Sequence, residues 1–189
     1  MLLRPNHPLA RAMTYRLPAL LLAALLGLSQ CKKKDPTPEE QLPPATQTGA
    51  NTLGCLVNGQ PWTPQGNNGS SNYSVSYDRG LGASFDLRAY RYQQNPTDNF
   101  QYIIIETSRL YAPKAYSIKD SLNTRVALYD RLTGCDLSSL SPGTYRKGTL
   151  TITRLDLQAG VIAGTFEFTL AKPGCDTVRV TQGRFDKKL

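Results

Sequence analysis

The most reactive side chains in this sequence are four cysteines and one histidine. The histidine, His7, lies ahead of Arg16 and an apolar run at residues 17–28, a pattern typical of a cleaved secretory signal. Cleavage leaves a chain without histidine. This excludes a Ser-His-Asp or Cys-His relay and any histidine-ligated metal site.

Carboxylates are the remaining groups that could act as acids, bases or nucleophiles. A glycosidase needs two of them about 5–9.5 Å apart across a sugar. No motif pairs any two of the carboxylates expected on or beside strands, which are Asp86, Glu106, Asp156 and Glu167. We therefore expect no catalytic residue and no enzyme activity, with a carboxylate-dependent glycan hydrolase as the least favoured alternative.

Cys31 follows the apolar run directly, a position typical of bacterial lipoprotein signals, in which the thiol is lipidated and the chain is cut before it. The run is too short to span a bilayer, which takes about 20 residues. Gln30 departs from the small residue usual before the cut; an ordinary thiol or an uncleaved anchor are the alternatives. We predict a signal peptide over residues 1–30, with Met13 as the expected true start, and lipidation at Cys31.

The net charge is explained by the signal and the anchor. Loss of residues 1–30 removes three arginines and no acid, which lowers the formal charge from +8 to +5. Lys32–Lys34 would lie at an anionic bilayer surface or simply in solvent. No basic stripe interleaved with aromatics remains, so we expect no nucleic-acid partner. Lys32, where an aspartate would favour inner-membrane retention, predicts the outer membrane; periplasmic face and cell surface both stay open.

The composition changes twice after Cys31. Residues 31–52 are rich in Pro, Thr, Gln and Glu and predict a lipid-anchored disordered tether. Residues 53–189 have the size of one domain with its own core.

Alternating apolar residues predict strands throughout residues 53–189. Asn58-Gly59 between short apolar runs indicates a type I′ hairpin. Phe100–Ser108 is an expected strand whose Ile103–Ile105 run suggests a central position with both faces buried. Residues 131–147 are expected to form a long loop, and Gly183 marks a bulge. Further strands are expected at 73–77, 81–92, 116–118, 125–130, 148–156, 162–170 and 178–182. We predict an all-β fold, a single antiparallel β-sandwich or squat barrel of about nine or ten short strands.

Four segments resemble an uncharacterised family of Bacteroidetes lipoproteins. Its members combine a "vNGk.W" hairpin with a "GtltIt…isGtFeF…itnGrFd" ending. The matching segments are Cys55–Trp62, Gly148–Asp156, Ile162–Phe168 and Val180–Asp186. The resemblance implies the fold and the envelope location but no mechanism.

Three cysteines besides Cys31 allow one intramolecular bridge outside the cytoplasm. Cys135 and Cys175 both lie in turn-rich Gly-Cys-Asp contexts, whereas Cys55 lies in an expected strand. We predict a Cys135–Cys175 disulfide, a buried Cys55 and no metal site or cofactor. Two short segments match a Bacteroidetes O-glycosylation acceptor, a match that also arises by chance: Asp120-Ser121-Leu122 and Asp176-Thr177-Val178.

The aromatic residues suggest a binding role. Tyrosines on strands can stack on sugars, although they are also ordinary sheet residues, and the single tryptophan is expected in the core. The candidates for ligand stacking are Trp62, Tyr90, Tyr92 and Tyr102. We expect a non-catalytic binding or interaction module of the cell envelope, with a glycan or an envelope protein as partner. A structural envelope component is the alternative.

Overall fold

The protein is described from a computed structural model, which covers residues 35–67, 69–93, 99–119 and 123–189. Cys31, Lys32–Lys34 and the Asp120-Ser121-Leu122 segment lie outside these residues. Among these described residues, no helix has both the length and the apolar character needed to cross a membrane. The described strands are β1 (Thr52–Val57), β2 (Gln60–Trp62), β3 (Tyr73–Asp78), β4 (Ser84–Gln93), β5 (Asn99–Thr107), β6 (Ala115–Ser117), β7 (Thr124–Asp130), β8 (Cys135–Ser138), β9 (Tyr145–Asp156), β10 (Val161–Ala171) and β11 (Val178–Lys188).

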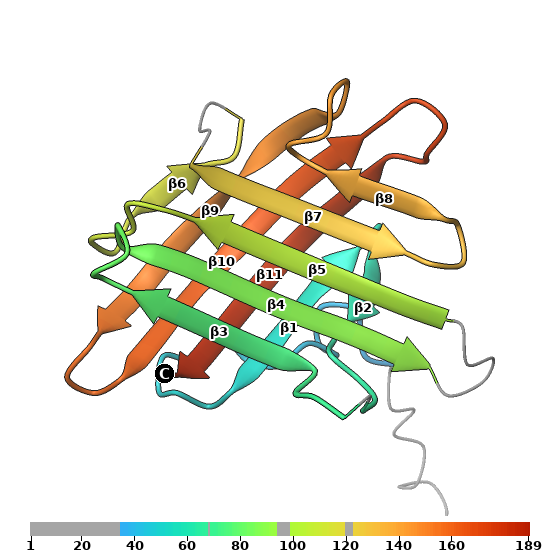
Figure 1. The fold of residues 1–189 in the computed structure, drawn as a ribbon. Helices are drawn as coiled ribbons and strands as arrows, with labels where there is room; N and C mark the ends of the chain where they lie inside the picture. Colours follow the sequence, from blue (N-terminus) through green and yellow to red (C-terminus); the bar gives the residue numbers. More distant parts are fainter. Residues whose placement is uncertain (1–34, 68, 94–98, 120–122) are drawn as a thin grey trace, which may run out of the picture. The chain divides into compact units, whose positions relative to one another are not determined.

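The strands form two antiparallel sheets, one of six strands in the order β2-β1-β11-β10-β9-β6 and one of five in the order β3-β4-β5-β7-β8. The two sheets lie in separate layers whose strands cross obliquely (Figure 1). Neither sheet closes on itself, because its two edge strands do not pair with each other: β2 and β6 are the edges of one sheet, and β3 and β8 are the edges of the other. The predicted all-β sandwich is therefore confirmed, and the squat barrel is not formed.

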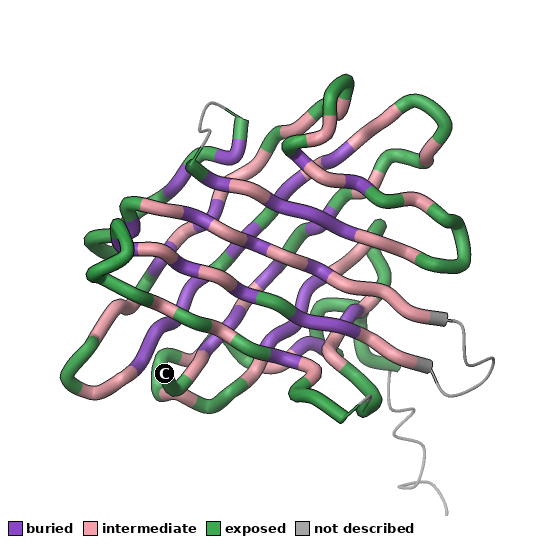
Figure 2. The backbone as a smooth tube through the Cα atoms, viewed as in Figure 1, coloured by how far each residue is buried: buried purple, intermediate pink, exposed green. Residues whose placement is uncertain are grey.

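The core lies between the two layers, because apolar residues at every second position of the strands face the other sheet. Along β4 and β5 buried residues alternate with less buried ones (Figure 2). Leu87, Ile103 and Ile105 of the five-stranded sheet are fully buried, as are Leu150 and Ile162 of the six-stranded sheet. Burial of such side chains contributes about 1.5–3 kcal/mol each relative to exposure.

Two local predictions are confirmed by the backbone. Asn58 and Gly59 both have positive φ, 49° and 81°, as a type I′ turn between β1 and β2 requires. In β11 the register against β10 shifts where Phe166 pairs with Gly183 and Phe168 with Val180. The intervening residues form the predicted bulge, and a Cβ on Gly183 would lie 2.4 Å from the Phe166 ring.

Two expectations differ from the structure. The long loop predicted for residues 131–147 contains a strand, β8, which pairs with β7 through Leu128 and Leu137. Cys135–Ser138 is too short for its alternation to stand out from a turn-rich context. Ile104 is only half-buried, because β5 is central in its sheet but its outer face has no second layer.

The structure also differs from the predicted tether over residues 36–51, which pack against the outer face of the six-stranded sheet. Leu42 is buried, and Pro43 lies so close to Gly54 that a Cβ there would be 2.5 Å from the Pro43 ring. Further along, Asp186 accepts hydrogen bonds from the backbone N–H groups of residues 48–50. Residues 36–51 contain few core-forming side chains, but the Asp186 carboxylate holds their backbone N–H donors in place. The compact unit accordingly begins at Pro36.

The predicted disulfide is confirmed. Cys135 and Cys175 are bonded, with 5.8 Å between their Cα atoms. Cys135 begins β8 in the five-stranded sheet, and Cys175 lies between β10 and β11 in the six-stranded sheet. The bond therefore ties the two layers together at one end of the sandwich. Asp176 and Thr177, next to it, are exposed, and O-glycosylation there stays a prediction.

Cys55 is buried with a free thiol, as expected for a small core residue. Burial raises the pKa of this thiol to about 12, although the positive charge of Arg91 acts in the opposite direction. Because the thiolate is the nucleophile, we expect no reaction of Cys55 with a thiol reagent at neutral pH in the native state. In a Cys31→Ser variant, colorimetric titration should count no thiol before denaturation and one after it. Rapid modification of one thiol in the native state would contradict this.

Candidate functional site

The outer face of the five-stranded sheet gathers aromatic residues from three neighbouring strands. Core residues occupy the inward positions of β4 and β5, so the residues between them point outward. The strand register then aligns Tyr90 with Tyr102 and Tyr102 with Tyr129, and it aligns Tyr92 with Phe100. We call these five residues the aromatic face.

The rings of the aromatic face touch in a continuous chain. Tyr102 and Tyr129 are stacked, with 5.2 Å between ring centroids and 22° between ring planes. Phe100 lies 5.9 Å from both Tyr90 and Tyr102 and 6.4 Å from Tyr92. Tyr90 is buried and the other four are half-buried, so ring surface on β5 and β7 remains open to solvent.

Tyr102 also keeps its hydroxyl available as a donor. Burial raises the pKa of this phenol, and the negative charge of Asp136 and the neighbouring Tyr129 raise it further. The hydroxyl therefore stays protonated at neutral pH. It can give a hydrogen bond to a ligand that lies on the ring.

Four charged residues lie on the same outer face of the five-stranded sheet. Arg88 Nη2 lies 2.8 Å from Asp86 Oδ2 and 3.3 Å from Glu106 Oε1, and Arg125 Nη1 lies 3.0 Å from Glu106 Oε2. These four residues, the charged ladder, occupy successive outward positions of β4, β5 and β7. Exposed ion pairs of this kind contribute at most about 1 kcal/mol to stability, so the ladder is mainly a source of surface hydrogen-bonding groups.

Two shallow hollows lie along this face. One, of about 390 Å³, is lined by residues that include Ser70, Ser71, Arg88, Phe100 and Tyr102. The other, of about 450 Å³, is lined by Asp86, Glu106 and Arg125 of the charged ladder and by residues that include Ser76, Asn123 and Leu140. A ligand along the sheet would thus meet aromatic rings in one hollow and charged groups in the other.

Trp62 is not part of this surface, which corrects its grouping with the three tyrosines. It is buried, and its indole Nε1 donates to Gln101 Oε1 at 3.0 Å. Gln101 Nε2 in turn donates to Asp130 Oδ2 at 2.8 Å. The tryptophan packs between the layers at the end of the sandwich that holds the disulfide.

The structure brings together three of the four stacking candidates: Tyr90, Tyr92 and Tyr102. Sequence reasoning missed Phe100 and Tyr129. Phe100 could have been found from its spacing of two from Tyr102. Tyr129 could not, because its place beside Tyr102 depends on β5 and β7 being neighbours.

The carboxylates considered for catalysis divide between the two sheets. Asp86 and Glu106 are cross-strand partners on the outer face, and both are held by arginines. Asp156 lies at the β9–β10 turn, where hydrogen bonds from the Ala159 N–H and from Arg154 lower the pKa of its carboxyl. Glu167 is exposed on the Thr-rich outer face of the six-stranded sheet. Asp86 and Glu106 line the same hollow as cross-strand neighbours on one sheet.

Fold and surface together define an antiparallel β-sandwich with one aromatic and charged outer face. No protein-family model, no curated protein and no solved structure matches this chain.

Proposed function

We propose that this protein is a non-catalytic binding module of the cell envelope and that the aromatic face with the charged ladder is its saccharide-binding surface. The observation that carries the proposal is the stacked pair Tyr102 and Tyr129, together with Arg88, which lines the same hollow as Tyr102. A sugar ring has an apolar C–H face and a rim of hydroxyls. The rings offer an apolar platform with a polar tip, and the ladder offers charge-assisted hydrogen bonds to the rim.

The surface favours binding over hydrolysis. A glycan hydrolase needs one carboxylic acid that can give up a proton and a second carboxylate on the other side of the scissile bond. Asp86 and Glu106 are cross-strand neighbours on one sheet, and Arg88 donates hydrogen bonds to both. Both acids accept hydrogen bonds from one guanidinium and lie on the same side of any sugar bound to the sheet, so this arrangement can hold hydroxyl groups but does not flank a glycosidic bond.

A structural envelope component without a small ligand is the second candidate, and an experiment separates it from the first. We expect the wild-type protein to bind a subset of saccharides on a glycan array. Tyr102→Ala should weaken that binding by about five- to 150-fold, if stacking of a sugar on one aromatic ring is worth the same ~1–3 kcal/mol as stacking of a nucleic-acid base.

The matched control is Tyr145→Ala, which removes a tyrosine that is 56% exposed on β9 of the other sheet. It should leave saccharide binding unchanged. If the wild-type protein binds no saccharide on the array, the structural role is favoured; if both variants bind equally well, the surface has been assigned wrongly.

The envelope location rests on Cys31, and the same proposal includes its lipidation and the outer membrane. We expect Cys31→Ala to leave the protein unprocessed or soluble, because acyl chains on that thiol would be its attachment to the bilayer. Detergent-phase partitioning of wild-type and variant protein measures this. Partitioning that survives the substitution would refute lipidation at Cys31, and protease treatment of intact cells would distinguish the cell surface from the periplasm.

The ordered residues 36–51 change how the anchor would work. The folded unit begins at Pro36, so a tether from Cys31 would be shorter than the predicted residues 31–52. The resemblance to Bacteroidetes lipoproteins supports the same location.

A further inference from the structure

A third hollow lies at the end of the sandwich that is closed by the disulfide, and it does not involve the aromatic face. Its volume is about 530 Å³, within the range of small-molecule sites. It lies where the β7–β8 hairpin, the β1–β2 hairpin and the β10–β11 connection come together. We call it the end hollow.

Apolar side chains form much of its wall. Trp62 and the four aliphatic residues that line it come from both sheets: Val57, Val178, Leu128 and Leu137. The Cys135–Cys175 disulfide completes this wall and connects the two sheets beside it. The apolar part of a ligand would therefore be covered on two sides.

The polar part of the wall is acidic. Asp130 and Asp176 line the end hollow, with Asn58, Gln101 and Thr133 as neutral neighbours. The hollow has no lysine or arginine in its lining, and within the described part of the chain neither aspartate forms an ion pair. This wall disfavours an anion and favours a cation.

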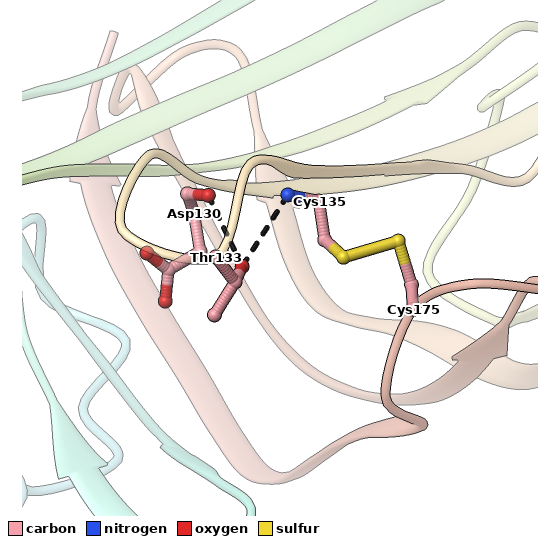
Figure 3. Close-up of a disulfide and its surroundings, with 4 residues drawn as sticks. All are labelled: Asp130, Thr133, Cys135 and Cys175. Atoms are coloured by element: carbon pink, nitrogen blue, oxygen red, sulfur yellow. Dashed lines mark hydrogen bonds between the residues drawn. A yellow bond between two sulfur atoms is a disulfide. The ribbon is translucent and has the colours of Figure 1, made fainter.

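The Asp130 carboxylate is held in place by neutral donors. Gln101 Nε2 donates to one oxygen at 2.8 Å, and the Leu132 N–H donates to the other at 2.9 Å. Gln101 is itself fixed by the Trp62 indole. Figure 3 shows that the Asp130 and Thr133 side chains project to the same side of the hairpin as the disulfide. A positioned carboxylate beside an indole ring is a combination that suits an organic cation.

We propose that the end hollow binds a small organic cation, namely a protonated amine on an apolar body. The amine pairs with Asp130 and Asp176, and the body lies against Trp62 and the aliphatic wall. A bare metal ion fits less well, because no group of three or more metal-ligating acidic, histidine or cysteine residues occurs among the described residues.

The single tryptophan of the chain makes the test direct, because its fluorescence reports on the end hollow alone. Three probes share one ring and differ in charge: cyclohexylmethylamine, cyclohexylmethanol and cyclohexanecarboxylate. Titrated into the full-length protein at neutral pH, the amine should change Trp62 emission saturably. We expect it to bind about tenfold more tightly than the alcohol, the ratio typical of one partly desolvated charge pair, and the carboxylate to bind least.

Variants identify the groups responsible. Asp130→Asn keeps the shape and an acceptor for Gln101 and should reduce amine affinity to that of the alcohol; Asp176→Asn should weaken it in the same direction. Asp136→Asn, an exposed neighbour on β8, is the matched control and should change nothing. Tyr102→Ala should also leave amine binding intact, which separates this site from the saccharide surface.

Calorimetry provides a second readout for probes that leave emission unchanged. Equal affinity for amine and alcohol would overturn the proposal, as would tighter binding of the carboxylate or no binding of any probe in both assays. Undiminished amine affinity in both Asp130→Asn and Asp176→Asn, or its loss in Tyr102→Ala, would place the cation elsewhere and overturn it equally.

Discussion

Cys135→Ser is expected to lower the free energy of unfolding by about 4 kcal/mol. The disulfide joins cysteines 40 residues apart, and closing a loop of that length restricts the unfolded chain by about this amount in the chain-entropy model. Domains of this size are stable by about 5–15 kcal/mol, so much of the stability is involved. Differential scanning calorimetry should show a melting temperature lower by roughly 8–16 °C.

Reductant and Cys55 provide the controls for this prediction. A reducing agent should lower the melting temperature of the wild-type protein toward that of Cys135→Ser and should have little effect on the variant itself. Cys55→Ser should behave as a core substitution whose effect is independent of reductant, because Cys55 has no sulfur partner. A Cys135→Ser variant that melts with the wild-type protein would show that the bridge contributes no stability.

Asp186→Ala is expected to destabilise the protein by about 3–5 kcal/mol, because several hydrogen-bond donors would lose the buried carboxylate that accepts from them. The side chain of Thr46 and the N–H groups of Thr48, Gly49 and Ala50 donate to its two oxygens at 2.7–3.1 Å. Without the carboxylate these backbone donors lose their partner. Denaturant titration measures the change, and residues 36–51 should exchange amide hydrogens faster even below the unfolding transition.

Glu167→Ala is the matched control for Asp186→Ala. It removes a carboxylate from the same outer face of the same sheet, where Glu167 is exposed. The change in unfolding free energy should be within about 0.5 kcal/mol. Equal effects of the two substitutions would mean that Asp186 does not hold residues 36–51 in place.

Asp186 also gives the stability a dependence on pH. Burial would raise the pKa of its carboxyl, but hydrogen bonds from Thr46, Ala50, Thr48 and Gly49 outweigh burial and lower it. A pKa lower in the folded state than in the unfolded state stabilises the fold above the unfolded value of about 3.9. That contribution is lost as pH falls through the folded value. The stability difference between wild type and Asp186→Ala should therefore be constant near neutral pH and shrink below about pH 4.

The contrast between residues 36–51 and the strands shows where reasoning from composition is insufficient. The strands can be predicted from a local period of two in apolar residues, and this pattern is recognisable without knowing the partner strand. Residues 46–50 are hydrogen-bonded to Asp186, which is more than 130 residues away. A hydrogen-bond acceptor so distant in the chain leaves no local sequence pattern. The composition of the segment alone therefore predicted a tether.

The sequence by itself determined the all-β class, the inward residues of most strands, the turn at Asn58-Gly59 and the choice of Cys135 and Cys175 for the bridge. These depend on alternation, turn chemistry and the small number of cysteines, all of which can be counted along the chain. Only the tertiary structure decided that β5 lies between β4 and β7, which places Tyr102 beside Tyr129 and Glu106 beside Arg125. Strand order results from how two whole sheets pack, so the residues of the candidate surface come together only when the entire sandwich has formed.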